Sequence, residues 1–156
     1  MGLSHTDSQG NPQMVDVSAK DITSRLARAQ GVVRLGAKVA EQLANSPITA
    51  KGNVLQVGRL AGIQGAKRTW ELIPLCHPLP LERIEVTAEL VGECVRIQAT
   101  VAARARTGLE MEALTAVSVA ALSVYDMCKA LGKEIEITDI HLLEKTGGKS
   151  GAYHRK

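Results

Sequence analysis

Phenylalanine is absent from this chain of 156 residues, which has only one tryptophan and two tyrosines. Hydrophobic residues still make up 45% of the sequence, so the core must consist of Val, Leu, Ile and Ala. A core of small side chains favours close backbone packing and often continues across a subunit interface. Basic residues interleaved with stacking aromatics, typical of single-strand binders, are absent too. With a net charge of only +3, the sequence indicates a small anionic ligand rather than a nucleic acid.

Cysteines and targeting segments are also scarce. The three cysteines, Cys76, Cys94 and Cys128, have no CxxC spacing, which argues against a disulfide framework and for a reducing compartment. The first residues lack the apolar stretch of a signal peptide, and no apolar run reaches spanning length without a charge. We therefore expect a cytoplasmic protein without membrane contact.

The hydrophobic periodicity predicts a single domain over residues 1–156. Strands are expected at 31–35, 81–90, 94–105 and 134–142, and helices at 36–44, 53–71 and 108–133. This order is that of an α+β, ferredoxin-like βαββαβ fold: an antiparallel sheet, helices on one face and an extra helix before the second strand. Residues 1–20 are expected to be a flexible arm, in which 14–17 resembles a short edge strand. Residues 146–156 are expected to be a mobile, basic, Gly-rich tail.

The helix at 108–133 has an uncharged middle and ionisable groups near both ends. Glu110 and Glu112 fall in its first turn, and Asp126 and Lys129 in its last two. Such a helix has no wet face, so we expect it to be buried against its own sheet and against another subunit. At about 1.5 Å per residue, Glu112 and Asp126 lie roughly 21 Å apart along the axis. Either one end alone is functional, or a site joins the head of one helix to the tail of a symmetry mate.

Helix capping is the simpler interpretation of these groups. It accounts for Glu110, Glu112 and Lys129, because acids favour the first turn of a helix and lysine the last. It does not account for Asp126, which sits near the negative end of the helix dipole. Asp126 and Lys129 can form an ordinary i,i+3 pair, and general acid–base chemistry is the competing hypothesis.

A second candidate is the segment 72–79, in which Cys76 and His77 lie between Pro74 and Pro78. The prolines keep the backbone extended, which suits a loop that faces a ligand. A thiolate nucleophile, half of a metal site and a buried thiol beside an imidazole all fit this pair. The buried thiol is favoured for Cys76, because the sequence reveals neither further metal ligands nor a base oriented by a third group. Ligand contact is the hypothesis for His77.

The tail resembles a phosphate-binding loop only at first sight. Gly148, Lys149 and Ser150 mimic the end of a Walker A motif, but the position of its first glycine is Leu143. Only six residues follow Ser150, too few for a helix that could cap a phosphate. The tail cations either close over an anionic ligand or are solvated. The other cations are ordinary surface residues by default, namely Arg25, Arg28, Lys51, Lys67 and Arg68.

Six segments carry a resemblance to a known family. They are MVDV at 14–17, AGIQ at 61–64, ELIPLCHPL at 71–79, EMEALTAVS at 110–118, YDMCK at 125–129 and GGKSG at 147–151. Together they resemble the cyclic pyranopterin monophosphate synthases, the molybdenum cofactor biosynthesis protein C family, over almost the whole chain.

The resemblance implies a lyase of molybdenum cofactor biosynthesis. It would convert (8S)-3′,8-cyclo-7,8-dihydroguanosine 5′-triphosphate, the product of a radical enzyme, to cyclic pyranopterin monophosphate and pyrophosphate. It also implies a homohexamer, a trimer of dimers, with sites at subunit interfaces. No organic cofactor and no protein-bound metal are implied, and a magnesium ion on the phosphates stays open.

The family's functional residues carry over by position. The catalytic residues would be Asp126, Lys51 and Lys129. Those binding the substrate would be Leu75, Cys76, His77, Glu110, Met111 and Glu112, with Lys67, Lys145 and Lys149 at the phosphates. Two alternatives stay open from the residues alone: a nucleotide-binding module without turnover, and a metal hydrolase using His77 and the carboxylates.

Overall fold

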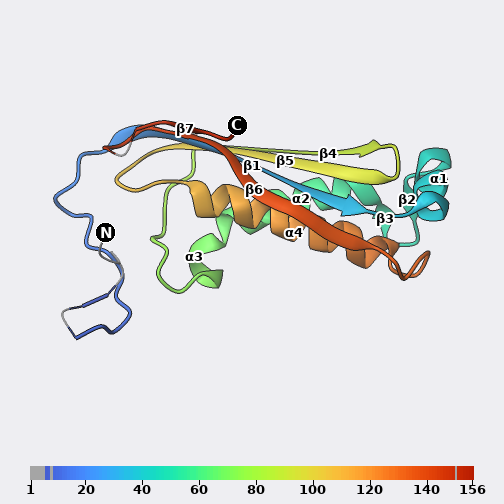
Figure 1. Ribbon diagram of the computed structural model, residues 1–156, viewed down its shortest axis with the longest axis horizontal. Helices are drawn as coiled ribbons and strands as arrows, with labels where there is room; N and C mark the ends of the chain where they lie inside the picture. The colour runs from blue at the N-terminus through green and yellow to red at the C-terminus, as the bar shows by residue number, and fades with distance from the viewer. Residues whose placement is uncertain (1–5, 8, 150) are drawn as a thin grey trace.

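A five-stranded antiparallel sheet forms one layer of the protein (Figure 1). The computed structural model describes residues 6–7, 9–149 and 151–156. The strands are β1 (Thr23–Arg34), β4 (Arg83–Val91), β5 (Cys94–Ala105), β6 (Glu136–Thr146) and β7 (Tyr153–His154). They lie in the order β4-β5-β1-β6-β7, and every neighbouring pair is antiparallel. The first four of these strands have the ferredoxin-like order, as predicted.

Two long helices cover one face of this sheet (Figure 1), namely α2 (Val54–Lys67) and α4 (Glu110–Cys128). The short helix α3 (Thr69–Leu72) lies near the start of α4. At the other end of the molecule are α1 (Ala37–Asn45) and a small hairpin of β2 (Ile48–Thr49) and β3 (Gly52–Asn53). The predicted α+β class, with its helices on one face and an extra helix before the second long strand, is confirmed.

The two long helices touch each other backbone to backbone. α2 presents Gly58, Gly62 and Gly65 to α4. A Cβ atom added at Gly62 would lie 2.9 Å from the carbonyl oxygen of Ala116, and one at Gly65 would lie 2.8 Å from Cβ of Val119. The glycines thus allow the two helix backbones to approach closely, as expected for a core built of small side chains. α4 is therefore closely packed against α2 over about three turns of helix.

α4 is also the one helix in the described part of the chain that is long and apolar enough to cross a membrane. Here it serves as the central core helix, packed against α2 and the sheet, with residues such as Ala116, Val117 and Val124 fully buried. Its apolar composition is therefore explained by burial inside the protein.

β1 is longer than the strand predicted at 31–35. It pairs along its whole length with β5, from Thr23 opposite Ala105 to Arg34 opposite Cys94. The arginines in its first half obscure the alternation with small buried alanines, so the period of two is not evident in the sequence.

The helix predicted at 53–71 is divided in two. The break is at Arg68, whose φ of −108° and ψ of 11° leave the helical region. The hydroxyl of Thr69 donates to the carbonyl oxygens of Gly65 and Ala66 near the end of α2. A new short helix then begins at Thr69.

The N-terminal arm and the tail both contact the folded body. The edge strand predicted at 14–17 is not formed, because the carbonyl of Val15 accepts a hydrogen bond from His77 instead of from a neighbouring strand. In the tail, β7 pairs with Glu144 and Lys145 of β6. The mobility expected of both segments stays a prediction.

Candidate active site

Asp126 lies between two lysines at the C-terminal end of α4. Oδ2 of Asp126 is 2.6 Å from Nζ of Lys51, and Oδ1 is 2.7 Å from Nζ of Lys129. We call these three residues the lysine–aspartate cluster. All three side chains are at least half exposed, so the cluster faces a surface and not the core. The ordinary i,i+3 pair predicted for Asp126 and Lys129 is present, but it is half of a larger arrangement.

The two ammonium groups set the protonation of the cluster. Hydrogen bonds from Lys129 and Lys51 lower the pKa of Asp126 to about 2. In return, the hydrogen bond and charge of Asp126 raise the pKa of Lys129. At neutral pH the carboxylate is therefore ionised and a weak base, and it holds Lys129 firmly protonated.

The hairpin of β2 and β3 presents Lys51 to the cluster. Its turn is closed by the Thr49 hydroxyl, which accepts a hydrogen bond from the backbone N–H of Lys51 and donates to the carbonyl of Gly52. Gly52 has φ of 106°, a left-handed conformation that suits glycine. A cavity of about 540 Å³ opens beside the cluster, toward α1 and the hairpin.

At the other end of α4, a cavity of about 370 Å³ contains the cysteine and histidine; we call it the thiol cavity. It is lined by Val15, Val17, Lys20, Leu75, Cys76, His77, Leu79, Thr107, Gly108, Glu110, Met111 and Glu112. All six residues at 75–77 and 110–112 that the resemblance assigns to substrate binding therefore meet in one place.

Burial controls the acid and the thiol of this cavity. Glu112 is only 4% exposed, and burial raises its pKa to about 7, with a smaller contribution from the charge of Glu110. Burial, and then the charge of Glu112, raises the pKa of Cys76. The thiol therefore stays protonated, which argues against a thiolate nucleophile. Cys76 is only partly buried and lines a cavity, so the buried thiol predicted from the sequence is wrong in its degree of burial.

His77 joins this cavity to the N-terminal arm. Its Nε2 lies 2.8 Å from the carbonyl oxygen of Val15. Because a carbonyl only accepts, Nε2 carries the proton and donates. The arm therefore forms part of the wall, with Val15 and Val17 as apolar lining.

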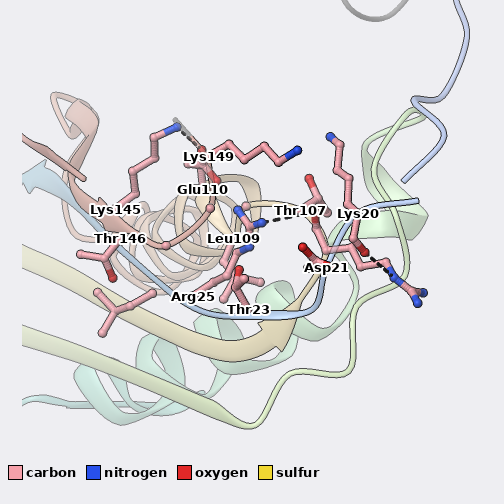
Figure 2. Close-up of a pocket in the computed structure, with 15 residues that line it drawn as sticks. Lys20, Asp21, Thr23, Arg25, Thr107, Leu109, Glu110, Lys145, Thr146 and Lys149 are labelled. Atoms are coloured by element: carbon pink, nitrogen blue, oxygen red, sulfur yellow. Dashed lines mark hydrogen bonds and ion pairs between the residues drawn. The ribbon is translucent and has the colours of Figure 1, made fainter. Parts of the chain in front are cut away.

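A third cavity, of about 550 Å³, adjoins the thiol cavity; we call it the cationic cavity (Figure 2). The two cavities share Lys20, Thr107, Gly108 and Glu110. Its lining comes from the start of β1 and the residues before it, the segment that leads into α4, and the end of β6 with the residues after it. The cations lining it are Lys20, Arg25, Arg106, Lys145 and Lys149, and the acids are Asp21 and Glu110. Such an excess of positive charge suits a phosphate-bearing ligand.

This cavity exists because the sheet extends beyond the start of α4. Arg25 follows the alternation that puts Ala27 and Ala29 on the helix-covered side of β1, and Lys145 of β6 lies opposite Ala27. Because these two positions lie beyond the N-terminal start of α4, their side chains border a cavity instead of the core. The expectation that Arg25 is an ordinary surface cation is therefore wrong. Its guanidinium donates to the carbonyls of Ala105 and Arg106, which fixes it in the wall.

Two of the expectations from the sequence, a phosphate contact of Lys67 and a metal site, find no support in the cavities described above. Lys67 is exposed at the end of α2 and lines neither of these cavities, so its contact with phosphate stays a prediction. Among the described residues, no three His, Cys, Asp or Glu side chains gather as metal ligands. The metal-hydrolase alternative thus has no ligand set in the described part of the chain.

Comparison with known proteins identifies the family. The model of the MoaC family matches residues 14–148. The chain belongs to the MoaC family. It is similar to cyclic pyranopterin monophosphate synthase 3 of Mycobacterium tuberculosis, with 54% identity over 154 residues, 98% of this chain and 86% of that protein. The synthase of Rhodospirillum rubrum is 55% identical over 154 residues, 97% of this chain and 92% of that protein.

A longer relative matches equally well. Molybdenum cofactor biosynthesis protein 1 of Drosophila melanogaster is 56% identical over 149 residues, which are 94% of this chain. This chain spans only 26% of the length of the fly protein, so it corresponds to one part of that protein. The MoaC membership and the reaction class predicted from the six segments, a lyase of molybdenum cofactor biosynthesis, are confirmed by these matches.

Proposed function

We propose that the chain converts 3′,8-cyclo-7,8-dihydroguanosine 5′-triphosphate to cyclic pyranopterin monophosphate and pyrophosphate, in the cytoplasm. The radical enzyme that makes this nucleotide would act in the preceding step. The observation that carries the proposal is the contact of Asp126 with both Lys51 and Lys129, in a chain that is more than half identical to synthases of this name.

The reaction calls for proton transfer and charge neutralisation. The purine-derived ring opens and recloses as the pterin. A ribose hydroxyl attacks the α-phosphorus, so that one P–O bond forms and the bond to pyrophosphate breaks. We infer that Asp126 stays ionised and orients both lysines. Lys51 then donates a proton to the leaving or carbonyl group, and the firmly protonated Lys129 stabilises developing negative charge. None of these steps is a redox reaction, so none uses a redox cofactor.

The cationic cavity is the proposed site of the triphosphate. Lys145, Lys149 and Arg25 supply positive charge, and the uncapped N-terminus of α4 adds its dipole, since Leu109 at the N-cap makes no side-chain hydrogen bond. The adjoining thiol cavity would receive the base, with Glu112 and His77 as hydrogen-bonding partners. Any magnesium ion would arrive on the phosphates.

The separation of these sites supports an oligomer. Glu112 and Asp126 are fourteen residues apart on one straight helix, or about 21 Å at 1.5 Å per residue. We infer a homohexamer, a trimer of dimers, in which the substrate cavities of one subunit face the lysine–aspartate cluster of another. The exposed side chains of Leu60 and Leu122 on the outer helix surfaces would then be covered.

One assay tests the reaction. Purified protein is incubated with the cyclised triphosphate, and pyrophosphate and pterin are measured together. We expect both in equal amounts. A non-catalytic binding module would return the nucleotide unchanged, and release of phosphate without a pterin would also contradict the proposal.

Mixing inactive variants tests the shared site. Glu112→Ala and Asp126→Ala proteins are combined under conditions of subunit exchange, which is verified with differently tagged chains. Activity should return, because some pockets then contain both wild-type residues. No recovery would place the complete site within one chain.

A further inference from the structure

Glu110 is in contact with both cavities and with one of the cations. It lines the cationic cavity and the thiol cavity, and its Oε1 lies 2.8 Å from Nζ of Lys145 (Figure 2). Both side chains are less than one-third exposed, at 28% for Glu110 and 31% for Lys145. A partly buried pair of this kind is screened less by salt than a surface pair.

The surrounding structure favours this contact. A Cβ atom at Gly108 would overlap the carboxylate of Glu110, so only glycine leaves room for the side chain to fold back here. Lys145 lies on β6, beyond the N-terminal start of α4, and lines the cationic cavity as Glu110 does.

Lys145 differs from the other cations of the cavity. Among the described cations that line it, Lys145 alone has an ion-pair partner, whereas Arg25 and Arg106 bond to backbone carbonyls. Five cations and two acids leave the lining with a net charge of +3. Pyrophosphate carries several negative charges, so a cavity in which no acid competed with it for the cations would release this product slowly.

We propose that Glu110 is a positioning residue that competes with the phosphates for Lys145 and thereby speeds the release of pyrophosphate. When phosphates bind, Lys145 exchanges its carboxylate partner for a phosphate oxygen, and the pair re-forms as pyrophosphate leaves. No covalent bond changes in this exchange. This inference rests on the proposed function, because it assumes that the phosphates occupy the cationic cavity.

The test uses inorganic pyrophosphate as the probe and calorimetry on the assembled full chain. Glu110→Gln keeps the size of the side chain and removes its charge, so pyrophosphate should bind about tenfold more tightly. Turnover at saturating substrate should fall, and inhibition by pyrophosphate should become stronger. A pair with only a structural role would act oppositely, because loosening the wall would weaken binding. Unchanged or weaker pyrophosphate binding in Glu110→Gln overturns the inference.

Two further proteins make the result specific. Glu144 lies next to Lys145 on β6, but on the opposite face of the sheet, where it forms an ion pair with Arg28. Glu144→Gln breaks that pair and should leave pyrophosphate affinity unchanged. In the Lys145→Ala background, Glu110→Gln should give no gain in affinity, because the competing pair no longer exists; a full gain there overturns the inference. If Lys145→Ala binds pyrophosphate as well as the wild type, the phosphate site of the proposed function itself is wrong.

Discussion

Two acids on one helix have opposite environments. Glu112, at the start of α4, is buried and has no ion-pair partner among the described residues, and its pKa rises to about 7. Asp126, near the end of the same helix, is exposed between two lysines, and its pKa falls to about 2. Near neutral pH the first is partly protonated and can donate a hydrogen bond, whereas the second is fixed as an anion. Position relative to the core, and not residue type, assigns these roles.

Substitution of Asp126 should have the largest effect. Asp126→Asn keeps the shape but removes the charge that orients Lys51 and Lys129, so we expect turnover to fall about a hundredfold or more. Pyrophosphate affinity should change little, because Lys145, Lys149 and Arg25 of the cationic cavity supply the charge that binds it. Lys149→Ala is the matched control, with weaker substrate binding and a smaller effect at saturation. Steady-state kinetics measures both, and near-normal turnover of a folded Asp126→Asn protein would end the catalytic assignment.

Glu112 should make stability depend on pH. Its pKa is about 7 in the folded protein against an ordinary value of 4.5, so the stability that its protonated form contributes is fully present below pH 4.5 and is lost as the pH rises through 7. The loss is at most about 3 kcal/mol. Glu112→Gln should flatten this part of the curve, measured by urea unfolding between pH 4 and 8.

Asp126 gives the opposite sign and a different range. Because its pKa is lowered, its contribution is present above its ordinary value of 3.8 and is lost only as the pH falls toward 2. Asp126→Asn should therefore leave the unfolding curve between pH 4 and 8 unchanged in shape. If Glu112→Gln and Asp126→Asn changed the pH dependence of stability equally between pH 4 and 8, the contrast between the two acids would be wrong.

The close packing of α4 against α2 can be tested by substitution. Gly62→Ala would push a methyl group against the carbonyl of Ala116, which lies 2.9 Å from the added atom. We expect a loss of about 2 kcal/mol in the free energy of unfolding, as for other overpacked cores. Gly92→Ala is no suitable control, because Gly92 has a positive φ. Ala61→Gly at a partly exposed position of the same helix should cost less. A melting temperature unchanged by Gly62→Ala would contradict the close packing.

Thr49 offers the smallest and most local change. Thr49→Val removes the hydroxyl that closes the hairpin turn but keeps the volume, so Lys51 loses its fixed approach to Asp126. Turnover should fall about tenfold, with little change in substrate affinity. Thr49→Ser, which retains the hydroxyl, should restore most of the activity. Equal activity of the two variants would show that the turn does not position Lys51.

Much of the architecture was predictable because it depends on local patterns. β5 has the predicted bounds, 94–105, since a turn at Gly92 and strict alternation define it. The pair of Asp126 and Lys129 follows from helical spacing alone. Contact with Lys51 does not, because 75 residues separate it from Asp126. The resemblance to a family assigned that lysine, and no periodicity could have done so.

The cationic cavity was harder to predict for a geometric reason. It depends on where α4 starts relative to the sheet, which the hydrophobic periodicity of the sequence does not specify. The first half of β1 was also missed, so Arg25 had no predicted neighbours. Residue types indicated an anionic ligand, but only tertiary structure determines which cations gather around it.

Trp70 has a consequence for spectroscopy. It is the single tryptophan of the sequence, lies in α3 shortly before the loop of Cys76 and His77, and is 47% exposed. All tryptophan emission from this protein therefore originates in α3, which contacts α4, and none from the lysine–aspartate cluster. A partly hydrated indole emits at longer wavelength than a buried one. Fluorescence would thus follow ligand entry or subunit docking at one end of α4, without any attached label.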